Sequence, residues 1–595
     1  MRIDERSASF VALGLAKASR RPAALVCTSG SAPAHFHAAL IEADEAGVPL
    51  LVLTADRPPE LRGTGANQTV DQLKMYGSSV RWFCEVGVPE ARPGMTGYWR
   101  SLACRAWASA AGAAGGFPGP VHLNVALREP LVPDAGDVGG AGDDVGGYGG
   151  GAGGSGGGAA PDGRRDGEPW TAFSAGAAGP GRLLTLSTAH PSGPDPLEGT
   201  STGFPGSGLA GSGLAGSGLA GSGLAGSGPV GPGLPGLELA WTERGVIVCG
   251  DGDYDPVPLL ELAEAAGWPV LAEPSSNARR GPNALSAYSY LLDAPGFTAA
   301  HRPDLIISAG RPGLSRAQLA FLRGTPGAAP ARHVVLAQGP GRWADPARTA
   351  TDVALAVRLR HGPGRPAGES GWLASWRRAD AAARAAADAV LDADGSLSEP
   401  RLARDLAAVL PAGALLWAAS SLPVRDLDQQ MAPRSDIRVL ASRGASGIDG
   451  LVSAATGAAL AHQAAGGGPA CALLGDLAFL HDCAGLFLGP GEPRPDLAIV
   501  VANNDGGGIF SMLEPAGFPG PFERVFGTPH GADLGFLARA AGLAYQRVDT
   551  PADLGAALAG AGLRIIEVRA DRTAGAQLRS RLRAACAAGA AAARA

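Results

Sequence analysis

The sequence predicts an α/β protein made of three doubly wound, parallel-sheet domains with a long Gly-rich insertion. Short apolar runs alternate with helical segments in three blocks of the chain, the pattern of parallel strands joined by helices. A glycine-dominated stretch from about Pro133 to Pro235 separates the first block from the second. In the last block, strands ending in Gly475-Asp476 and Asn503-Asn504 flank a helical segment, which brings both polar ends to one edge of a sheet.

Length and composition limit the classes of protein. The chain has 595 residues, enough for three or four domains, and 46% of them are hydrophobic. A net charge of -6 gives no electrostatic case for nucleic acid or an anionic membrane. Seven cysteines without a CxxC pair indicate free thiols in a reducing compartment. No apolar run reaches the roughly 20 residues that span a bilayer, and the first residues do not form a signal peptide. We therefore expect a cytoplasmic enzyme.

The first block is expected to cover residues 1–133. Met1 to Asp4 is expected to be the tail of a strand, and the apolar residues after Arg6 predict a buried helix. A second helix is predicted to end near Ala46. The predicted strands are 23–28, 48–55 and 119–127.

The insertion, residues 134–236, repeats the unit GSGLA four times from Gly206. Such a composition buries too little apolar surface to offset its ordering entropy, so a flexible linker is predicted. The short piece around Trp170 is the part expected to dock onto a domain.

Two further α/β blocks follow, at residues 237–365 and 366–595. The third block opens with an Ala/Arg-rich helix near Trp372. The predicted strands are 245–250, 268–273, 304–310 and 333–338 in the second block, and 414–420, 437–442, 470–475, 497–503 and 564–568 in the third.

The strand ends in the third block predict a metal site. The Asp476 carboxylate, the Asn504 side-chain oxygen and the Gly506 carbonyl suit a hard divalent cation that also binds phosphate oxygens, Mg²⁺ or alternatively Mn²⁺. The spacing resembles the thiamin diphosphate motif, in which Asn-Asn follows Gly-Asp at a distance of roughly 25 to 30 residues. The motif's third glycine is Leu477 here, so an ordinary strand-helix-strand unit stays open as an alternative.

A second Gly-Asp-Gly, at Gly250, competes with this motif. Asn277 follows it at a similar distance, but without a second Asn or the glycines behind it. The same residues would be the basis for a dinucleotide-binding protein, although no GxGxxG opens a helix there.

Seven sequence motifs carry a resemblance to a known family. They are DERSASFVALGLAKAS, TSGSAPAH, LTADRPPELRGTGANQ, GPVHLNVALREPL, SSLPVRDLDQ, SRGASGIDGL and NNDGGGIFSML. In order and spacing they resemble the MenD family, the 2-succinyl-5-enolpyruvyl-6-hydroxy-3-cyclohexene-1-carboxylate synthases of menaquinone biosynthesis. The family has a Leu after Gly-Asp, as this chain does.

The resemblance implies a fold of the thiamin diphosphate-enzyme type, with a pyrimidine-binding domain (1–133), a central transhydrogenase-like domain (237–365) and a diphosphate-binding domain (366–595). It implies a transferase that decarboxylates 2-oxoglutarate and adds the succinyl semialdehyde carbanion to isochorismate by 1,4-addition. The cofactor would lie between subunits of a homodimer or tetramer.

The resemblance also implies roles for individual residues. Glu5 would be the catalytic carboxylate that shifts the cofactor's aminopyrimidine to its imino form, and Ile448 would bend the cofactor. The other cofactor contacts would be Gly30, Ser446, Gly475, Asp476, Asn504, Gly506 and Ile509.

The two substrates are dicarboxylates, for which guanidinium groups are suitable partners. The matching motif positions imply that Phe510 and Leu513, with Ile509, form an apolar wall. The positions implied for substrate binding are Arg57, Asn67, Gln68, Arg316, Ser421, Arg425 and Arg443.

The resemblance departs at the start of the chain. Family members carry roughly 50 residues before the Glu that matches Glu5, and we expect a misassigned start codon to explain the difference. Three alternatives stay open: an acetohydroxyacid synthase-like ligase, a truncated pseudoenzyme acting through its Gly-rich linker, and the dinucleotide-binding protein.

Overall fold

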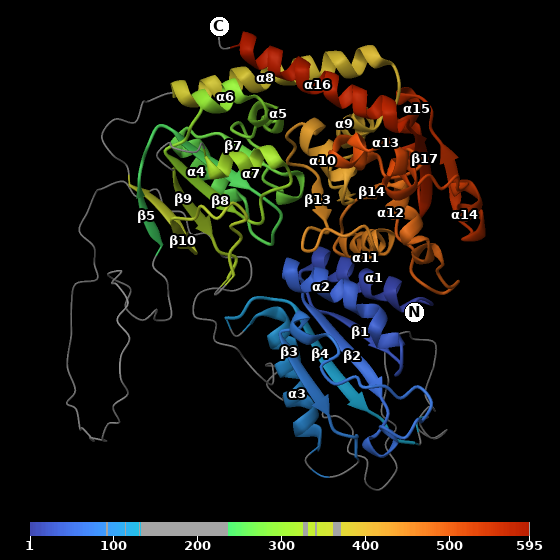
Figure 1. The fold of residues 1–595 in the computed structure, drawn as a ribbon. Helices are drawn as coiled ribbons and strands as arrows, with labels where there is room; N and C mark the ends of the chain where they lie inside the picture. The colour runs from blue at the N-terminus through green and yellow to red at the C-terminus, as the bar shows by residue number, and fades with distance from the viewer. Residues whose placement is uncertain are drawn as a thin grey trace, which may run out of the picture.

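The computed structural model describes residues 1–90, 93, 95–113, 115–129, 131, 236–324, 331–339, 342–360 and 370–593. Three parallel sheets are flanked by helices, and Figure 1 shows them as three bodies in chain order. The predicted linker, with its GSGLA units and Trp170, lies outside the described residues. The fold class predicted from the sequence is therefore confirmed for the described part of the chain.

The first sheet has the strand order β1-β2-β4-β3, and all of its strands are parallel. Its elements are α1 (Glu5–Ser19), β1 (Ala23–Cys27), α2 (His37–Ala46), β2 (Leu50–Asp56), β3 (Trp82–Val86), α3 (Met95–Ala111) and β4 (Pro120–Ala126). The prediction of a strand at Met1 to Asp4 is wrong. Asp4 is instead the N-cap of α1, because its carboxylate accepts hydrogen bonds from the backbone N–H groups of Arg6 and Ser7.

The central sheet has the order β10-β9-β8-β6-β7, and a separate pair joins β5 to β11. The predicted strands are all present. The elements are β5 (Leu237–Ala240), β6 (Gly245–Cys249), α4 (Val257–Ala266), β7 (Val270–Ala272), α5 (Tyr288–Asp293), α6 (Pro295–Ala300), β8 (Leu305–Ala309), α7 (Arg316–Arg323), β9 (Arg332–Leu336), β10 (Asp352–Ala354) and β11 (Val357–Arg360).

The third sheet has the order β13-β12-β14-β15-β17-β16, with every pair parallel. Its strands are β12 (Leu415–Ala418), β13 (Arg438–Ala441), β14 (Ala470–Gly475), β15 (Leu497–Asn503), β16 (Ala544–Arg547) and β17 (Arg564–Arg569). Its helices are α8 (Gly371–Asp394), α9 (Glu399–Val409), α10 (Leu422–Gln430), α11 (Leu451–Ala464), α12 (Asp476–His481), α13 (Pro519–Phe522), α14 (Leu534–Ala540), α15 (Pro551–Leu558) and α16 (Arg572–Ala592).

Two helix pairs join the bodies. Helix α1 packs on α11, between the first and third sheets (Figure 1), and a Cβ added at Gly14 would lie 2.0 Å from the Ala454 carbonyl oxygen. A Cβ at Gly457 would lie 2.0 Å from the Val11 carbonyl oxygen. Gly14 and Gly457 therefore set how closely the first domain approaches the third.

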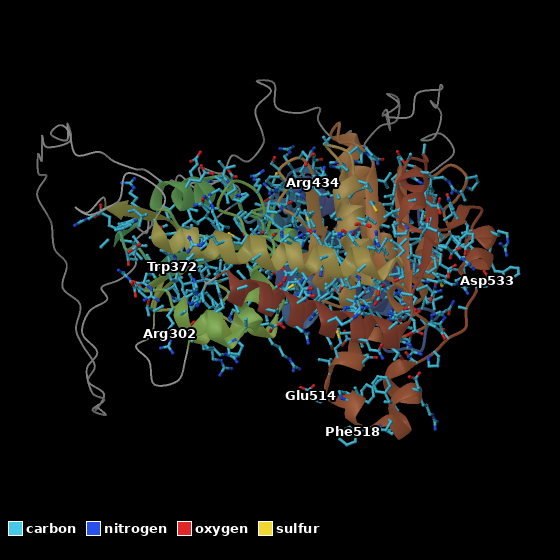
Figure 2. All side chains as sticks on the ribbon, turned by 90° about the horizontal axis from the view of Figure 1, so that it is seen from above. Arg302, Trp372, Arg434, Glu514, Phe518 and Asp533 are labelled. Atoms are coloured by element: carbon cyan, nitrogen blue, oxygen red, sulfur yellow. The ribbon has the colours of Figure 1, made fainter. Side chains whose placement is uncertain are left out.

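Helices α8 and α16 run side by side (Figure 2) and share a core with the central domain.

The described residues contain seven free cysteines, as the sequence predicted. Among these same residues, no helix has both the length and the apolar character that a membrane crossing requires.

Candidate functional site

Asp476 stands where β14 ends and α12 begins, and its side chain is almost completely buried. Its Oδ2 accepts hydrogen bonds from the backbone N–H groups of Asn504, at 3.1 Å, and Gly506, at 2.8 Å, and its Oδ1 accepts one from Leu477 at 2.7 Å. Burial raises the pKa of the carboxyl group, which these hydrogen bonds oppose. A Cβ at Gly475 would meet nothing within 4 Å, so the space beside this strand end is open.

Asn504 follows β15, the strand that pairs with β14. Its Nδ2 donates to Glu399 Oε1 at 2.7 Å, while its Oδ1 is buried without a hydrogen-bond partner. The Gly506 carbonyl accepts from the Gly508 N–H at 3.0 Å and keeps a second lone pair. Gly506 has a φ of +138°, and a Cβ there would lie 1.9 Å from the Gly527 carbonyl oxygen, so a side chain is excluded. An unpaired buried amide oxygen beside a carboxylate fits a divalent cation.

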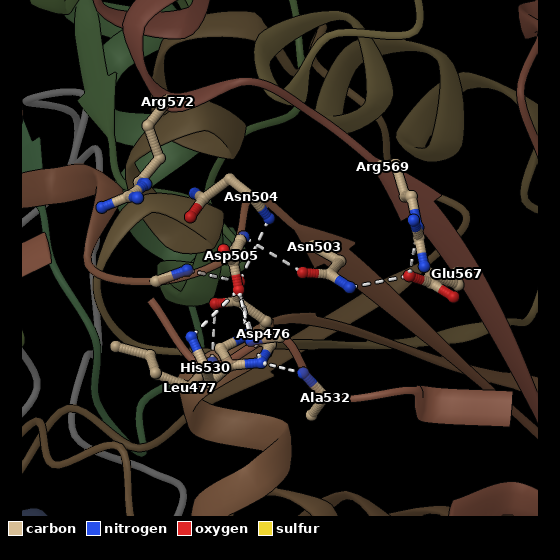
Figure 3. A network of polar contacts seen from close by, with 12 residues as sticks. Asp476, Leu477, Asn503, Asn504, Asp505, His530, Ala532, Glu567, Arg569 and Arg572 are labelled. Carbon is tan, nitrogen blue, oxygen red and sulfur yellow. Dashed lines mark hydrogen bonds and ion pairs between the residues drawn. The ribbon is translucent and has the colours of Figure 1, made fainter. Parts of the chain in front are cut away.

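His530 was missed by sequence reasoning. Its Nε2 lies 3.3 Å from Asp476 Oδ2, and the Ala532 N–H donates to its Nδ1 at 2.9 Å, which places the ring proton on Nε2. Asp505 Oδ1 accepts from the His530 N–H at 3.0 Å and so fixes the loop. Figure 3 shows Asp476, Asn504 and His530 drawn together at the strand ends. The segment TPHG gave no periodic signal by which to find the residue.

Two of the predicted substrate arginines lie close together. The Ser421 carbonyl accepts a hydrogen bond from Arg425 Nη1 at 2.8 Å, and Ser421 has a φ of +73°. Burial, reinforced by the neighbouring Arg443 guanidinium, lowers the pKa of Arg425. Two guanidinium groups that repel one another favour a bound anion, which would reduce the repulsion.

A cavity of about 620 Å³ opens beside Arg425, between the central and third domains. Of the residues predicted to bind substrate or form the apolar wall, it is lined by Arg316, Arg425, Ile509 and Leu513; Arg583 of α16, not predicted, also lines it. Arg316 pairs with Glu514 at 2.9 Å, and both side chains are largely exposed. Glu514 lies on the projecting segment at the lower edge of Figure 2. Phe510 is absent from the lining, and its ring packs 5.4 Å from that of Phe526.

A second group of predicted residues gathers in the first domain. Arg57 Nη2 donates to Gln68 Oε1 at 3.1 Å, and Arg57 Nε donates to the Asn67 carbonyl at 3.3 Å. Gly30 has a φ of +93°, and its N–H donates to Gln72 Oε1 at 3.0 Å. A Cβ at Gly30 would lie 3.4 Å from the Cβ of Gln68. The structure thus brings Gly30, Arg57, Asn67 and Gln68 together, apart from the cavity beside Arg425.

Glu5 is the first residue of α1 and is half-buried. Within the described part of the chain, its carboxylate has no hydrogen-bond or ion-pair partner. Burial raises the pKa of the Cys27 thiol to about 12, and the nearby Glu5 carboxylate adds to the shift. The next residue, Arg6, donates to the His481 carbonyl at 2.7 Å and ties the start of α1 to the end of α12.

The loop before α11 carries Ser446, with a φ of +61°, and Ile448, which is half-buried against the core. Gln68, Ser421 and Asp505 also have positive φ values. Non-glycine residues in this region carry backbone strain, which concentrates at functional sites. Of the nine non-glycine residues with positive φ in the described part of the chain, Gln68, Ser421 and Ser446 were predicted site residues, and Asp505 follows Asn504.

The competing Gly-Asp-Gly motif is used in domain contacts. Asp251 pairs with Lys17 of α1 at 3.2 Å. The Asn277 side chain donates to the Val439 carbonyl at 3.0 Å and accepts from the Val439 N–H at 2.9 Å. Both side chains therefore join the central domain to its neighbours.

Comparison with known proteins identifies the family. Residues 1–75 match the thiamine pyrophosphate enzyme N-terminal TPP-binding domain, and residues 425–568 match the corresponding C-terminal TPP-binding domain. The chain is 55% identical over 588 residues to the 2-succinyl-5-enolpyruvyl-6-hydroxy-3-cyclohexene-1-carboxylate synthase of Thermobifida fusca, covering 99% of this chain and 91% of that protein. The chain belongs to this synthase family. It is a transferase-type enzyme that depends on thiamin diphosphate.

Other relatives agree with membership of the synthase family. The protein of the same name from Saccharopolyspora erythraea is 42% identical over 576 residues, covering 96% of this chain and 87% of that protein. Benzoylformate decarboxylase from Polynucleobacter necessarius has a similar structure, with a TM-score of 0.54, 17% identity, and coverage of 96% of this chain and 91% of that one. At that identity the likeness concerns the fold alone.

Proposed function

We propose that this chain decarboxylates 2-oxoglutarate and adds the resulting succinyl semialdehyde carbanion to isochorismate, giving the product named by its family, 2-succinyl-5-enolpyruvyl-6-hydroxy-3-cyclohexene-1-carboxylate, and CO₂. The observation that carries the site assignment is the buried, unpaired Asn504 Oδ1 beside Asp476 at adjacent strand ends. We place the reaction in menaquinone biosynthesis and in the cytoplasm, and divide the chain into domains at residues 1–133, 237–365 and 366–595, with 134–236 as an insertion.

The cofactor's diphosphate would be held through Mg²⁺, or Mn²⁺, by Asp476, Asn504 and the Gly506 carbonyl. Each supplies an oxygen, the atom that hard divalent cations prefer. Thiamin diphosphate, when bound, supplies the carbon nucleophile and the electron sink. The remaining contacts proposed for the cofactor come from Gly30, Ser446, Ile448, Gly475 and Ile509.

Glu5 would share a proton with the ring nitrogen of the cofactor's pyrimidine. A half-buried carboxylate that no described side chain engages is available for this role. We propose that the chain forms a homodimer or a tetramer and that Glu5 acts on a cofactor held by Asp476 and Asn504 of the other chain. Two exposed apolar side chains support a partner surface near Glu5. Ile3, 82% exposed, is two residues from Glu5 in the sequence, and Val26, 72% exposed, precedes Cys27, whose thiol lies near the Glu5 carboxylate.

The carboxylates of the two substrates would be bound by guanidinium groups. Arg316 and Arg425 line the cavity, and Arg425 is the neighbour of Ser421 and Arg443. Arg57 lies with Asn67 and Gln68 in the first domain. Positioning these groups on three domains gives several cations for two dicarboxylates. Ile509 and Leu513, which line the cavity, would exclude water from the developing carbanion. Phe510, whose ring packs against Phe526, is the third residue proposed for this apolar wall.

The test is CO₂ release from 2-oxoglutarate, with and without isochorismate, together with identification of the product. Activity should require thiamin diphosphate and Mg²⁺, and should disappear in Asp476→Asn. The matched control is Asp496→Asn: this carboxylate pairs with Arg564 at 3.0 Å where β15 begins, at the opposite end of the strand from Asn504. CO₂ release that does not require the cofactor, or a different condensation product, would contradict the proposal.

A further inference from the structure

Asn504 is held by a chain of buried polar contacts that reaches the C-terminal helix. Glu399, the first residue of α9, accepts from Asn504 Nδ2 through Oε1 at 2.7 Å and from Arg579 Nη1 through Oε2 at 3.0 Å. Arg579, on α16, also donates to both oxygens of Asp426 at 3.1 and 2.5 Å. The side chains of Glu399, Arg579 and Asp426 are 6%, 6% and 4% exposed.

The two ends of the Asn504 amide differ in what they can bind. A carboxylate only accepts hydrogen bonds, so Glu399 selects the NH₂ end of the amide. The Oδ1 end must then point away, and there it is buried without a partner. If the amide were rotated by half a turn, its NH₂ group would face the cation, and an amide NH₂ group cannot bind a cation. Its oxygen would then face the carboxylate of Glu399, and the two oxygens would repel each other.

We propose that Glu399, held by Arg579, is a positioning residue that fixes Asn504 with its oxygen toward the divalent cation. The inference rests on the proposed metal site at Asp476 and Asn504. A hydrogen bond from a neighbouring residue to a metal ligand orients that ligand and tunes the affinity for the metal. Because Arg579 also binds Asp426, the neighbour of Arg425, one guanidinium group supports both the metal side and the substrate side of the site.

The first test replaces Glu399 by Gln. Because Arg579 donates to residue 399, the oxygen of the new Gln should turn toward Arg579. Its NH₂ group then faces Asn504 and favours the rotated orientation of the Asn504 amide. The Mg²⁺ affinity, measured by calorimetric titration at saturating thiamin diphosphate, should fall about 10- to 100-fold in Glu399→Gln. An unchanged affinity would overturn the inference.

The chain offers a matched control one residue before Asn504. Asn503 Nδ2 donates to the buried Glu567 Oε1 at 2.7 Å, and Arg569 donates to the same carboxylate at 3.0 Å (Figure 3). The other oxygen of Glu567 accepts from the Tyr545 hydroxyl. Glu567→Gln therefore neutralises a buried carboxylate next to the site without touching a proposed ligand, so the Mg²⁺ affinity should stay at the wild-type value. An equal loss in both variants would show a general packing effect and would overturn the inference.

A double variant tests the orientation directly. In Glu399→Gln with Asn504→Asp, the new carboxylate accepts from the Gln NH₂ with one oxygen and keeps the other for the cation. The Mg²⁺ affinity should return at least to the wild-type value. The melting temperature of each variant shows whether it is folded. Affinity as weak as in Glu399→Gln alone would overturn the inference. Asn504→Ala separates the two claims: if it leaves Mg²⁺ affinity unchanged, the proposed metal site itself is wrong.

Discussion

Glu42, on α2 of the first domain, accepts hydrogen bonds from the backbone N–H groups of Gly444 at 2.8 Å and Ala445 at 2.6 Å in the third domain. The Ser446 N–H donates to the same carboxylate at 3.2 Å. Burial raises the pKa of Glu42, an effect that Lys17 and these donors oppose. One buried carboxylate therefore holds the loop that follows Arg443 and leads to Ile448.

Removing this carboxylate should loosen the loop. In Glu42→Ala three backbone N–H groups lose their acceptor. Because Gly444 and Ser446 are half-buried and Ala445 is exposed, water replaces part of the lost bonding, and the cost of each should fall below the roughly 1–3 kcal/mol of a fully buried donor. We expect a lower melting temperature and a raised KM for a substrate held by Arg443. Glu45→Ala is the control, since this side chain lies on the same helix and is half exposed. Equal effects of the two substitutions would speak against the role of Glu42.

The approach of α1 to α11 should be sensitive to a single methyl group. In Gly14→Ala the new Cβ would lie 2.0 Å from the Ala454 carbonyl oxygen, and overpacking of this kind costs typically about 1–3 kcal/mol. The denaturant midpoint should fall. Gly97→Ala, in α3, places its Cβ in open space and should be neutral or stabilising by up to about 1 kcal/mol. A Gly14→Ala protein as stable as the wild type would contradict the described packing.

Arg425→Lys tests the recognition of dicarboxylates. A lysine keeps the charge but loses the planar pair of donors, and a charged hydrogen bond contributes about 1.5–3 kcal/mol, or about 10- to 150-fold in affinity. The KM of at least one substrate should rise accordingly, with kcat less affected. Arg434→Lys, whose arginine binds Asp436 through two hydrogen bonds outside this cavity, should leave both KM values unchanged. Unaltered KM values in Arg425→Lys would exclude the proposed contact.

We expect Glu273 to make the stability of the protein depend on pH. Its Oε1 accepts from the Gly313 and Leu314 N–H groups at 2.7 Å each, and burial, with Asp428 adding, raises its pKa to about 8. Because the folded pKa exceeds that of the unfolded chain, its contribution is fully present below about pH 4.5 and is lost as pH rises through about 8.

Glu273→Gln keeps the acceptor and removes the titration. Its stability relative to the wild type should therefore increase by about 1.4 kcal/mol per pH unit across this window. Urea midpoints of both proteins at three pH values within the window measure the difference. A difference that stays constant with pH would show that Glu273 does not titrate in this way.

The sequence could bring the proposed metal-site residues together because each follows an apolar strand. Asp476 and Asn504 could be placed at one sheet edge once the two strands were expected to be parallel neighbours. The positions of Glu399 and Arg579 could not be predicted in this way. They lie on helices whose packing against those strands no local sequence pattern indicates, and a lone Glu or Arg in an Ala-rich helix is typical of a solvated face. Their burial depends on how α9 and α16 pack, which is tertiary information.

The missed strands have a similar explanation. The strands that the sequence analysis did not predict are β3, β5, β10, β11 and β16. Of these, the edge strands β3 and β16 carry mixed polar residues, in contrast to the continuous apolar runs of β14 and β15. Met1 to Asp4 was expected to be the tail of a strand, but Asp4 is instead the N-cap of the helix that begins at Glu5. Phe510 was predicted from its place in a motif, and the structure turns its ring toward Phe526.

In the proposed assembly, one thiamin diphosphate is held by Asp476 and Asn504 of one chain and activated by Glu5 of another. Co-expression of Glu5→Gln with Asp476→Asn, each inactive alone, tests this arrangement. If the site is shared between chains, half of the dimers are mixed and each has one intact site, so about a quarter of wild-type activity should return. If the mixture stays as inactive as its parents while mixed dimers form, Glu5 does not serve the partner's cofactor, and the claim is contradicted.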